Sequence, residues 1–207
     1  MLLQKRLSPG VFNLVMGGIV LYGLLANVLG ALLFRPFLQR LDTIGLVFGW
    51  LVFFIIGLFC ARSKKLRMRI LAFHLIVVPF GPMLAAILVG HSGTQVLLAI
   101  TMTAVITAVM LLLSARFPHF FERMGGVLLL SLCMTLVVSV VAWFAGCHLS
   151  LLSVVFILIF SLYIGFDWYK AQTCEKTVAH AIDFAIDLYL DITNIFLDLL
   201  DLIDWLD

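Results

Sequence analysis

Seven apolar runs, each about 20 residues long, follow one another along the chain. They occupy residues 11–34, 44–61, 70–89, 95–115, 124–144, 149–168 and 179–206. A helix of about 20 apolar residues crosses the hydrocarbon core of a bilayer, and the continuous apolarity argues against the alternating strands of a barrel. The pattern predicts an all-α integral membrane protein, a seven-transmembrane helix bundle. Because the connecting loops are short, we expect residues 1–207 to form a single transmembrane domain.

The composition supports this class and limits the others. Of 207 residues, 64% are hydrophobic and only 12% are charged, which is too little polar surface to cover a soluble globule. There is no room for a soluble catalytic domain. The first run starts too late, is too long and lacks a small-residue cleavage site for a secretory signal, so we expect it to be retained.

The basic residues are distributed unequally between the two sides of the predicted bundle. Eleven of the 13 Lys and Arg residues fall in the N-terminal tail or in the loops after the second, fourth and sixth runs, and the opposite side holds only Arg35 and Arg40. The positive-inside rule then predicts a cytoplasmic N-terminus and an outward-facing C-terminus. The short tails and compact loops favour a bacterial plasma membrane. The basic run at 62–69 is typical of contact with lipid headgroups, and we expect no nucleic acid partner.

The acidic residues gather at the other end of the chain. Nine of eleven Asp and Glu residues lie at positions 167–207. An ionisable group at membrane depth costs roughly 2.5 to 3.5 kcal/mol on insertion scales, so it is rarely present without a role. Asp191 lies about 18 Å along the last run, close to the bilayer midplane. This distribution indicates that the protein handles a cation.

The polar residues of the last run share one helix face. At about 100° per residue they fall within an arc of roughly 140°. A stripe of this kind should face the bundle interior or a water-filled cavity. Its members are Asp183, Asp187, Asp191, Asn194, Asp198, Asp201 and Asp204.

Structural roles remain open for several of these acids. Asp183 is in the first turn, where a carboxylate is favoured by the helix dipole. The residues from Asp198 onward could form an amphipathic extension in the outer interface. Asp187 and Asp191 could be neutralised packing residues, and Asp167 could simply pair with Lys170 one turn on.

Two segments near the C-terminus resemble a known family. The segment FSLYIGFD at 160–167 and the segment LYLD at 188–191, followed by Asn194 and Phe196, are similar to the last two helices of the Bax-inhibitor-like (transmembrane Bax inhibitor motif) membrane proteins. Gly81-Pro82 in the third run and the count of seven spans agree with the same family. The additional aspartates of the last run depart from the family pattern.

The resemblance implies six helices around a central C-terminal helix, and a pair of aspartates that controls a pH-sensitive calcium leak. Carried over to this chain, the pair is Asp167 and Asp191. In bacterial members of the family, an Arg at the end of the second helix can form an ion pair, the latch, with the first of these acids. The matching position in this chain is Arg62. Arg62 could instead be one of the basic residues that anchor the cytoplasmic side.

Elementary chemistry gives the pair three competing states. Two carboxylates in a low dielectric share a proton, bind a cation or pair with an Arg. Calcium takes six to eight oxygen ligands, so water, Asn194, Asp187 or main-chain carbonyls would have to complete the shell around Asp167 and Asp191. Such a site suits transient calcium during passage, and we expect no resident cofactor.

Two further function classes remain open. The bundle could be a non-conducting regulator that binds a membrane protease or a stress-response partner, or a proton-coupled carrier of a small solute. The chain has no GxSxG, HExxH or GxGD motif, so we expect it not to be an enzyme.

Overall fold

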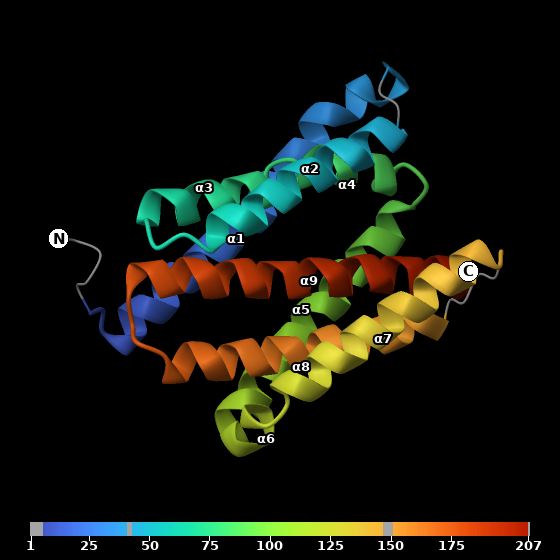
Figure 1. The fold of residues 1–207 in the computed structure, drawn as a ribbon. Helices are drawn as coiled ribbons and strands as arrows, with labels where there is room; N and C mark the ends of the chain where they lie inside the picture. Colours follow the sequence, from blue (N-terminus) through green and yellow to red (C-terminus); the bar gives the residue numbers. More distant parts are fainter. Residues whose placement is uncertain (1–5, 41–42, 147–150, 207) are drawn as a thin grey trace. The chain divides into compact units, whose positions relative to one another are not determined.

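A computed structural model of the protein describes residues 6–40, 43–146 and 151–206 (Figure 1). The regular structure of these residues is helical, as predicted. The elements are α1 (Pro9–Phe34), the 3-10 helix η2 (Arg35–Arg40), α2 (Thr43–Ala61), α3 (Leu66–Val77), α4 (Phe80–Leu88), α5 (Gly93–Arg116), α6 (Pro118–Glu122), α7 (Gly125–Phe144), α8 (Leu151–Thr173) and α9 (Val178–Leu206).

The helices have the length and composition of membrane spans. Five helical segments of the described chain are long and apolar enough to cross a bilayer, namely Pro9–Phe37, Leu66–Leu88, Gly93–Arg116, Gly125–Phe144 and Leu151–Thr173. A shorter apolar helix covers Gly45–Ala61. Large apolar side chains such as Leu14, Leu112 and Phe144 are more than two-thirds exposed, which suits contact with lipid. The protein is therefore an integral membrane protein of the all-α class.

Local sequence signals explain where several helices begin and end. The Ser8 hydroxyl accepts a hydrogen bond from the Val11 N–H at the start of α1, and Pro9 occupies the first turn. A capping box between Ser92 and Gln95 begins α5. Gly146 follows the end of α7 with φ of 68°, a left-handed conformation that glycine adopts without a steric penalty.

The third apolar run differs from the prediction of one helix over 70–89. It forms α3 and α4, which are separated at Val78 and Pro79, because proline lacks the N–H that a continuous helix needs. The run also begins earlier, so Arg67 and Arg69 of the basic segment are helical residues. Similarly, α8 continues to Thr173, five residues beyond the predicted end of the sixth run.

The chain divides into two compact units. One contains Met1–His91 and Cys174–Tyr189, and the other contains Ser92–Thr173 and Leu190–Asp207. Helix α9 contributes residues to both units without interruption (Figure 1). The expectation of a single domain over 1–207 stays a prediction.

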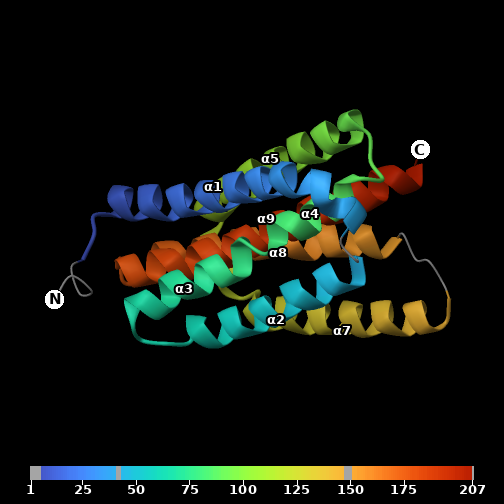
Figure 2. The same ribbon diagram turned by 90° about the horizontal axis from the view of Figure 1, so that it is seen from above.

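The first unit packs α1 against α4, and α2 against α3 and α4. Helices α2 and α3 lie side by side in both views (Figure 2). The backbones of α1 and α4 approach each other closely, because a Cβ placed on Gly81 would lie 2.9 Å from the Gly30 Cα. The Gly81-Pro82 pair noted in the sequence therefore marks a helix–helix contact, where small residues let backbones meet.

The second unit is organised around α8. This helix contacts α5, α6 and α7. Its buried residues include Ile157, Ile164 and Asp167, so one carboxylate lies within an otherwise apolar interior. A buried charge of this kind needs a proton, a partner or a bound cation.

Candidate cation site at an aspartate pair

Asp167 of α8 and Asp191 of α9 meet within the second unit. The two residues are 5% and 6% exposed, respectively. Their side chains interact with each other. Two carboxyl groups in contact cannot both ionise cheaply, so the pair is stabilised when it holds a proton or a cation. The arrangement can therefore exist in forms that differ by one proton and one unit of charge.

Lys170 is a second partner of Asp167. Its Nζ lies 3.4 Å from Asp167 Oδ1, one turn further along α8. The ammonium also lies 4.9 Å from the centroid of the Phe166 ring, in the range of a cation–π interaction. The Lys170 side chain is 45% exposed, whereas that of Asp167 is 8% exposed. The ion pair therefore extends from a buried carboxyl group to a partly exposed ammonium group.

The backbone beside Asp167 is fixed by close packing. The Ser114 hydroxyl of α5 donates a hydrogen bond of 2.6 Å to the Gly165 carbonyl. The ring of Phe121 from α6 fills the space that a side chain at Gly165 would need. Both Ser114 and Phe121 are 2% exposed. These contacts hold the segment of α8 that carries Asp167 and limit its freedom to rotate.

Asn194 and Asp187 flank Asp191 along the same face of α9. The Asn194 Nδ2 donates a hydrogen bond of 2.8 Å to the Leu190 carbonyl of its own helix. This bond uses the amide nitrogen and leaves the Oδ1 atom as the group that could bind a cation. Asp187 is half-buried and belongs to the part of α9 in the first unit.

The remaining acids of α9 become more exposed toward its C-terminal end. Asp198 is half-buried, whereas Asp201 and Asp204 are exposed. The Ser153 hydroxyl of α8 donates a hydrogen bond of 2.5 Å to Asp201 Oδ2. Asp198 through Asp204 are part of one regular helix with Asp191.

The predicted latch residue Arg62 belongs to the first unit. Its guanidinium carbon lies 5.9 Å from the centroid of the Phe59 ring, just after the end of α2. A contact between Arg62 and Asp167 stays a prediction. In the first unit another arginine, Arg69 of α3, forms an ion pair with Asp183 of α9 and donates a hydrogen bond of 3.0 Å to the Ser63 carbonyl.

Sequence reasoning missed two polar contacts to α9 in the first unit. The Arg69–Asp183 ion pair was not predicted, because Arg69 belongs to a basic cluster that is typical of contact with lipid headgroups. The Asn27 side chain of α1 donates a hydrogen bond of 2.5 Å to the Tyr189 hydroxyl, and both residues are almost fully buried. The sequence signal for this second contact was an Asn within an apolar run, because a polar side chain in a membrane often forms a hydrogen bond across helices.

No group of three or more His, Cys, Asp and Glu side chains that could hold a metal ion occurs among residues 6–40, 43–146 and 151–206. Asp42, His148 and Asp207 lie outside these described residues.

Comparison with known protein families gives a match that covers both helices of the site. The family model described as inhibitor of apoptosis-promoting Bax1 matches residues 4–205, which is nearly the whole chain. None of the curated proteins matches it. The match includes both helices of the aspartate pair and agrees with the resemblance in segments 160–167 and 188–191. The chain therefore belongs to the family of inhibitors of apoptosis-promoting Bax1, the Bax-inhibitor-like membrane proteins.

Proposed function

We propose that this protein is a pH-sensitive calcium leak of the membrane, gated by Asp167 and Asp191 between its last two helices. The observation that carries the proposal is the contact between these two buried carboxyl groups, each about 5% exposed, inside a membrane protein. An intramembrane ionisable pair is costly and typically marks an ion pathway or a proton relay. Family membership supports the same reading.

The gate works through competition between a proton and a cation. With one proton shared, the pair carries a single negative charge and the two helices are joined by a hydrogen bond. Loss of that proton leaves two carboxylates in contact, which either repel each other or bind a divalent cation. Neutral pH then favours calcium entry and acid closes the gate by restoring the shared proton.

Calcium is the transported ion in this proposal, and no resident cofactor is needed. Asp167 and Asp191 would supply carboxylate oxygens, and Asn194, Asp187, water or main-chain carbonyls would complete a coordination shell of six to eight. Lys170, which contacts Asp167, stabilises the ionised form of that residue. Arg62 would act as a latch that takes the place of the cation in a closed state. In this reading the protein is not an enzyme.

The architecture that we propose for this activity is a seven-span bundle with α9 at its centre. The N-terminus would be cytoplasmic, the C-terminus would be outside, and the membrane would be a bacterial plasma membrane. The inequality of eleven basic residues against two supports this orientation.

Calcium flux into proteoliposomes tests the proposal. The unmodified protein is compared with Asp167→Asn and Asp191→Asn at a series of pH values from mildly acidic to mildly alkaline. We expect flux that rises with pH, and loss of that pH dependence in both variants. The matched control is Asp204→Asn, which makes the same change at an exposed position of the same helix and should keep the response.

Three outcomes would contradict the proposal. Absence of flux at every pH from folded protein would favour a regulator that acts on a membrane-protein partner. Flux of protons that requires an added solute would favour a carrier. An equal effect of Asp204→Asn would mean that the general charge of α9, rather than the pair, sets the response.

A further inference from the structure

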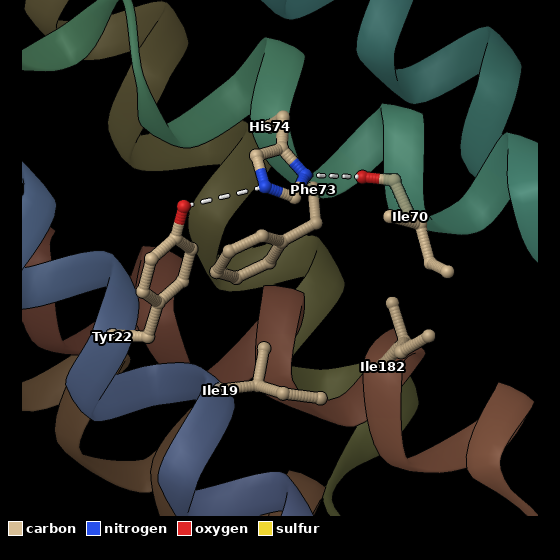
Figure 3. A pocket seen from close by; sticks show the side chains of 6 residues that line it. All are labelled: Ile19, Tyr22, Ile70, Phe73, His74 and Ile182. Atoms are coloured by element: carbon tan, nitrogen blue, oxygen red, sulfur yellow. Dashed lines mark hydrogen bonds between the residues drawn. The ribbon is translucent and has the colours of Figure 1, made fainter.

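A pocket opens on the first unit, whereas the aspartate pair belongs to the second unit. Its volume is about 220 Å³ and its lining is apolar. The lining comes from three helices, with two residues from α1, three from α3 and one from α9, and their side chains are drawn in Figure 3. These residues are Ile19, Tyr22, Ile70, Phe73, His74 and Ile182.

The polar atoms beside the pocket already have partners in the protein. His74 Nδ1 lies 2.8 Å from the Ile70 carbonyl (Figure 3). Because a carbonyl can only accept, Nδ1 carries the hydrogen, and in the neutral imidazole Nε2 then accepts from the Tyr22 hydroxyl 3.4 Å away. The space that remains is suited to an apolar group. Tyr22 and Ile70 are 49% and 42% exposed, so the pocket is open on the side of these residues.

A cationic side chain stands next to this opening. Arg67 is exposed and lies one turn before Ile70 on α3. At about 100° per residue, Arg67, Ile70 and His74 fall within roughly 60° on the same helix face. Arg69, on a different face, is instead paired with Asp183. Lys64 and Lys65, also exposed, precede α3 and add positive charge at the same end.

We propose that this pocket binds one acyl chain of an anionic phospholipid, and that Arg67 binds the phosphate of the same molecule. A pocket of about 220 Å³ has room for a short segment of an acyl chain. The rise from Arg67 to His74 is about 10 Å, which suits a chain segment of that size. Basic side chains beside a pocket between spans, on the cytoplasmic side, recognise the anionic headgroups of lipids.

The depth of each group agrees with a lipid rather than with a soluble ligand. Helix α3 begins at Leu66, directly after the basic loop that the charge distribution assigns to the cytoplasmic side. The headgroup partner is therefore at the membrane surface, and the apolar pocket lies further along α3 into the bilayer. Ile182 brings α9 into the binding site, one residue before Asp183 of the Arg69 ion pair. An occupied pocket would thus stabilise the first unit at α9.

Native mass spectrometry of the purified protein tests the site with two probes, phosphatidylglycerol and phosphatidylcholine with identical acyl chains. We expect the unmodified protein to bind one phosphatidylglycerol about fivefold more tightly than phosphatidylcholine. Arg67→Gln should abolish this preference, because one basic residue near a headgroup contributes about 1 kcal/mol, or about fivefold. Ile70→Trp should weaken binding of both lipids, since the larger side chain fills the pocket. Ile19→Trp fills the same pocket from α1. It is used in place of Ile70→Trp if Ile70→Trp loses its helix content.

Two matched controls make the same changes elsewhere. Arg123→Gln removes another exposed basic residue, and Leu14→Trp adds an indole to an exposed position of α1 outside the pocket. Both should bind like the unmodified protein. Equal binding of the two lipids to the unmodified protein, an unchanged preference in Arg67→Gln, or unchanged affinity in both tryptophan variants would overturn the proposal.

Discussion

The buried contact between Asn27 and Tyr189 allows a sharp test of how α9 is held in the first unit. The change Tyr189→Phe keeps the ring and removes only the hydroxyl oxygen that accepts the 2.5 Å hydrogen bond from Asn27. The two residues are 3% and 1% exposed, so water cannot replace the lost partner easily. Asn27 Oδ1 is itself buried without a hydrogen-bond partner in the described structure. The variant would therefore leave both polar ends of that amide unsatisfied.

The size of the effect follows from burial and environment. An unsatisfied buried donor costs about 1 to 3 kcal/mol in soluble proteins. Interhelical hydrogen bonds within membranes are worth less, about 0.6 kcal/mol on average and up to about 1.7. The short bond and deep burial put this contact near the upper end, so we expect Tyr189→Phe to lower the unfolding free energy by about 1 to 2 kcal/mol. Adding Asn27→Leu should recover part of that loss, because both polar partners are then gone.

Reversible unfolding in mixed detergent micelles, followed by circular dichroism, measures these differences. Tyr22→Phe is the matched control, because the hydroxyl that it removes belongs to a half-exposed residue with a long 3.4 Å contact. A change below about 0.3 kcal/mol for Tyr189→Phe would refute the reasoning, as would a double variant that is less stable by the full sum of the two single changes.

Three further predictions concern packing, charge and thiol chemistry. Gly165→Ala should lower the unfolding free energy by about 1 to 3 kcal/mol in the same assay, because the added methyl group overlaps a buried ring. Arg69→Gln should cost about 1 to 2 kcal/mol, because it leaves the half-buried Asp183 without its ion pair. Arg6→Gln, whose side chain is 80% exposed, should leave stability unchanged, and equal effects of the two changes would be inconsistent with this explanation. Burial raises the pKa of the Cys174 thiol despite a nearby lysine, so less of it is thiolate at neutral pH than for a free cysteine. Its maleimide labelling should therefore be slower than that of a free cysteine at neutral pH and should accelerate as the pH rises. Labelling as fast as that of a free cysteine at neutral pH would contradict this.

Much of the fold could be predicted because the bilayer imposes one length on every span. The runs at 11–34, 95–115 and 124–144 each match a helix within two residues at either end. The break of the third run was visible as Pro79, but the apolar run continues across it and hydropathy alone cannot separate a kinked span from a straight one. The early start of α3 was not predicted, because its first turn is basic and a basic segment between apolar runs is typical of a loop.

The candidate site was only partly accessible from sequence. Asp167 and Asp191 were found together through their resemblance to a family pattern, and the distance of 24 residues between them gives no contact by itself. The partner of Asp183 could not be found, since Arg69 is one of five basic residues between positions 62 and 69 and any of them could reach an acid. The choice among them depends on how α3 is rotated about its own axis, and tertiary packing determines that rotation.

The aspartates of α9 also bear on how the protein is made. Asp187 and Asp191 together oppose transfer of this helix from the translocon into lipid by roughly 5 to 7 kcal/mol, which cancels most of what its apolar residues contribute at about 0.3 to 0.6 kcal/mol each. Helix α9 is not among the described helices that are long and apolar enough to cross a membrane by themselves. It follows the other helices in the chain, so partners such as Asn27 and Arg69 are already synthesised when it emerges. Membrane insertion and tertiary assembly would therefore be one event for α9, whereas the more apolar helices can enter the bilayer first and pack afterwards.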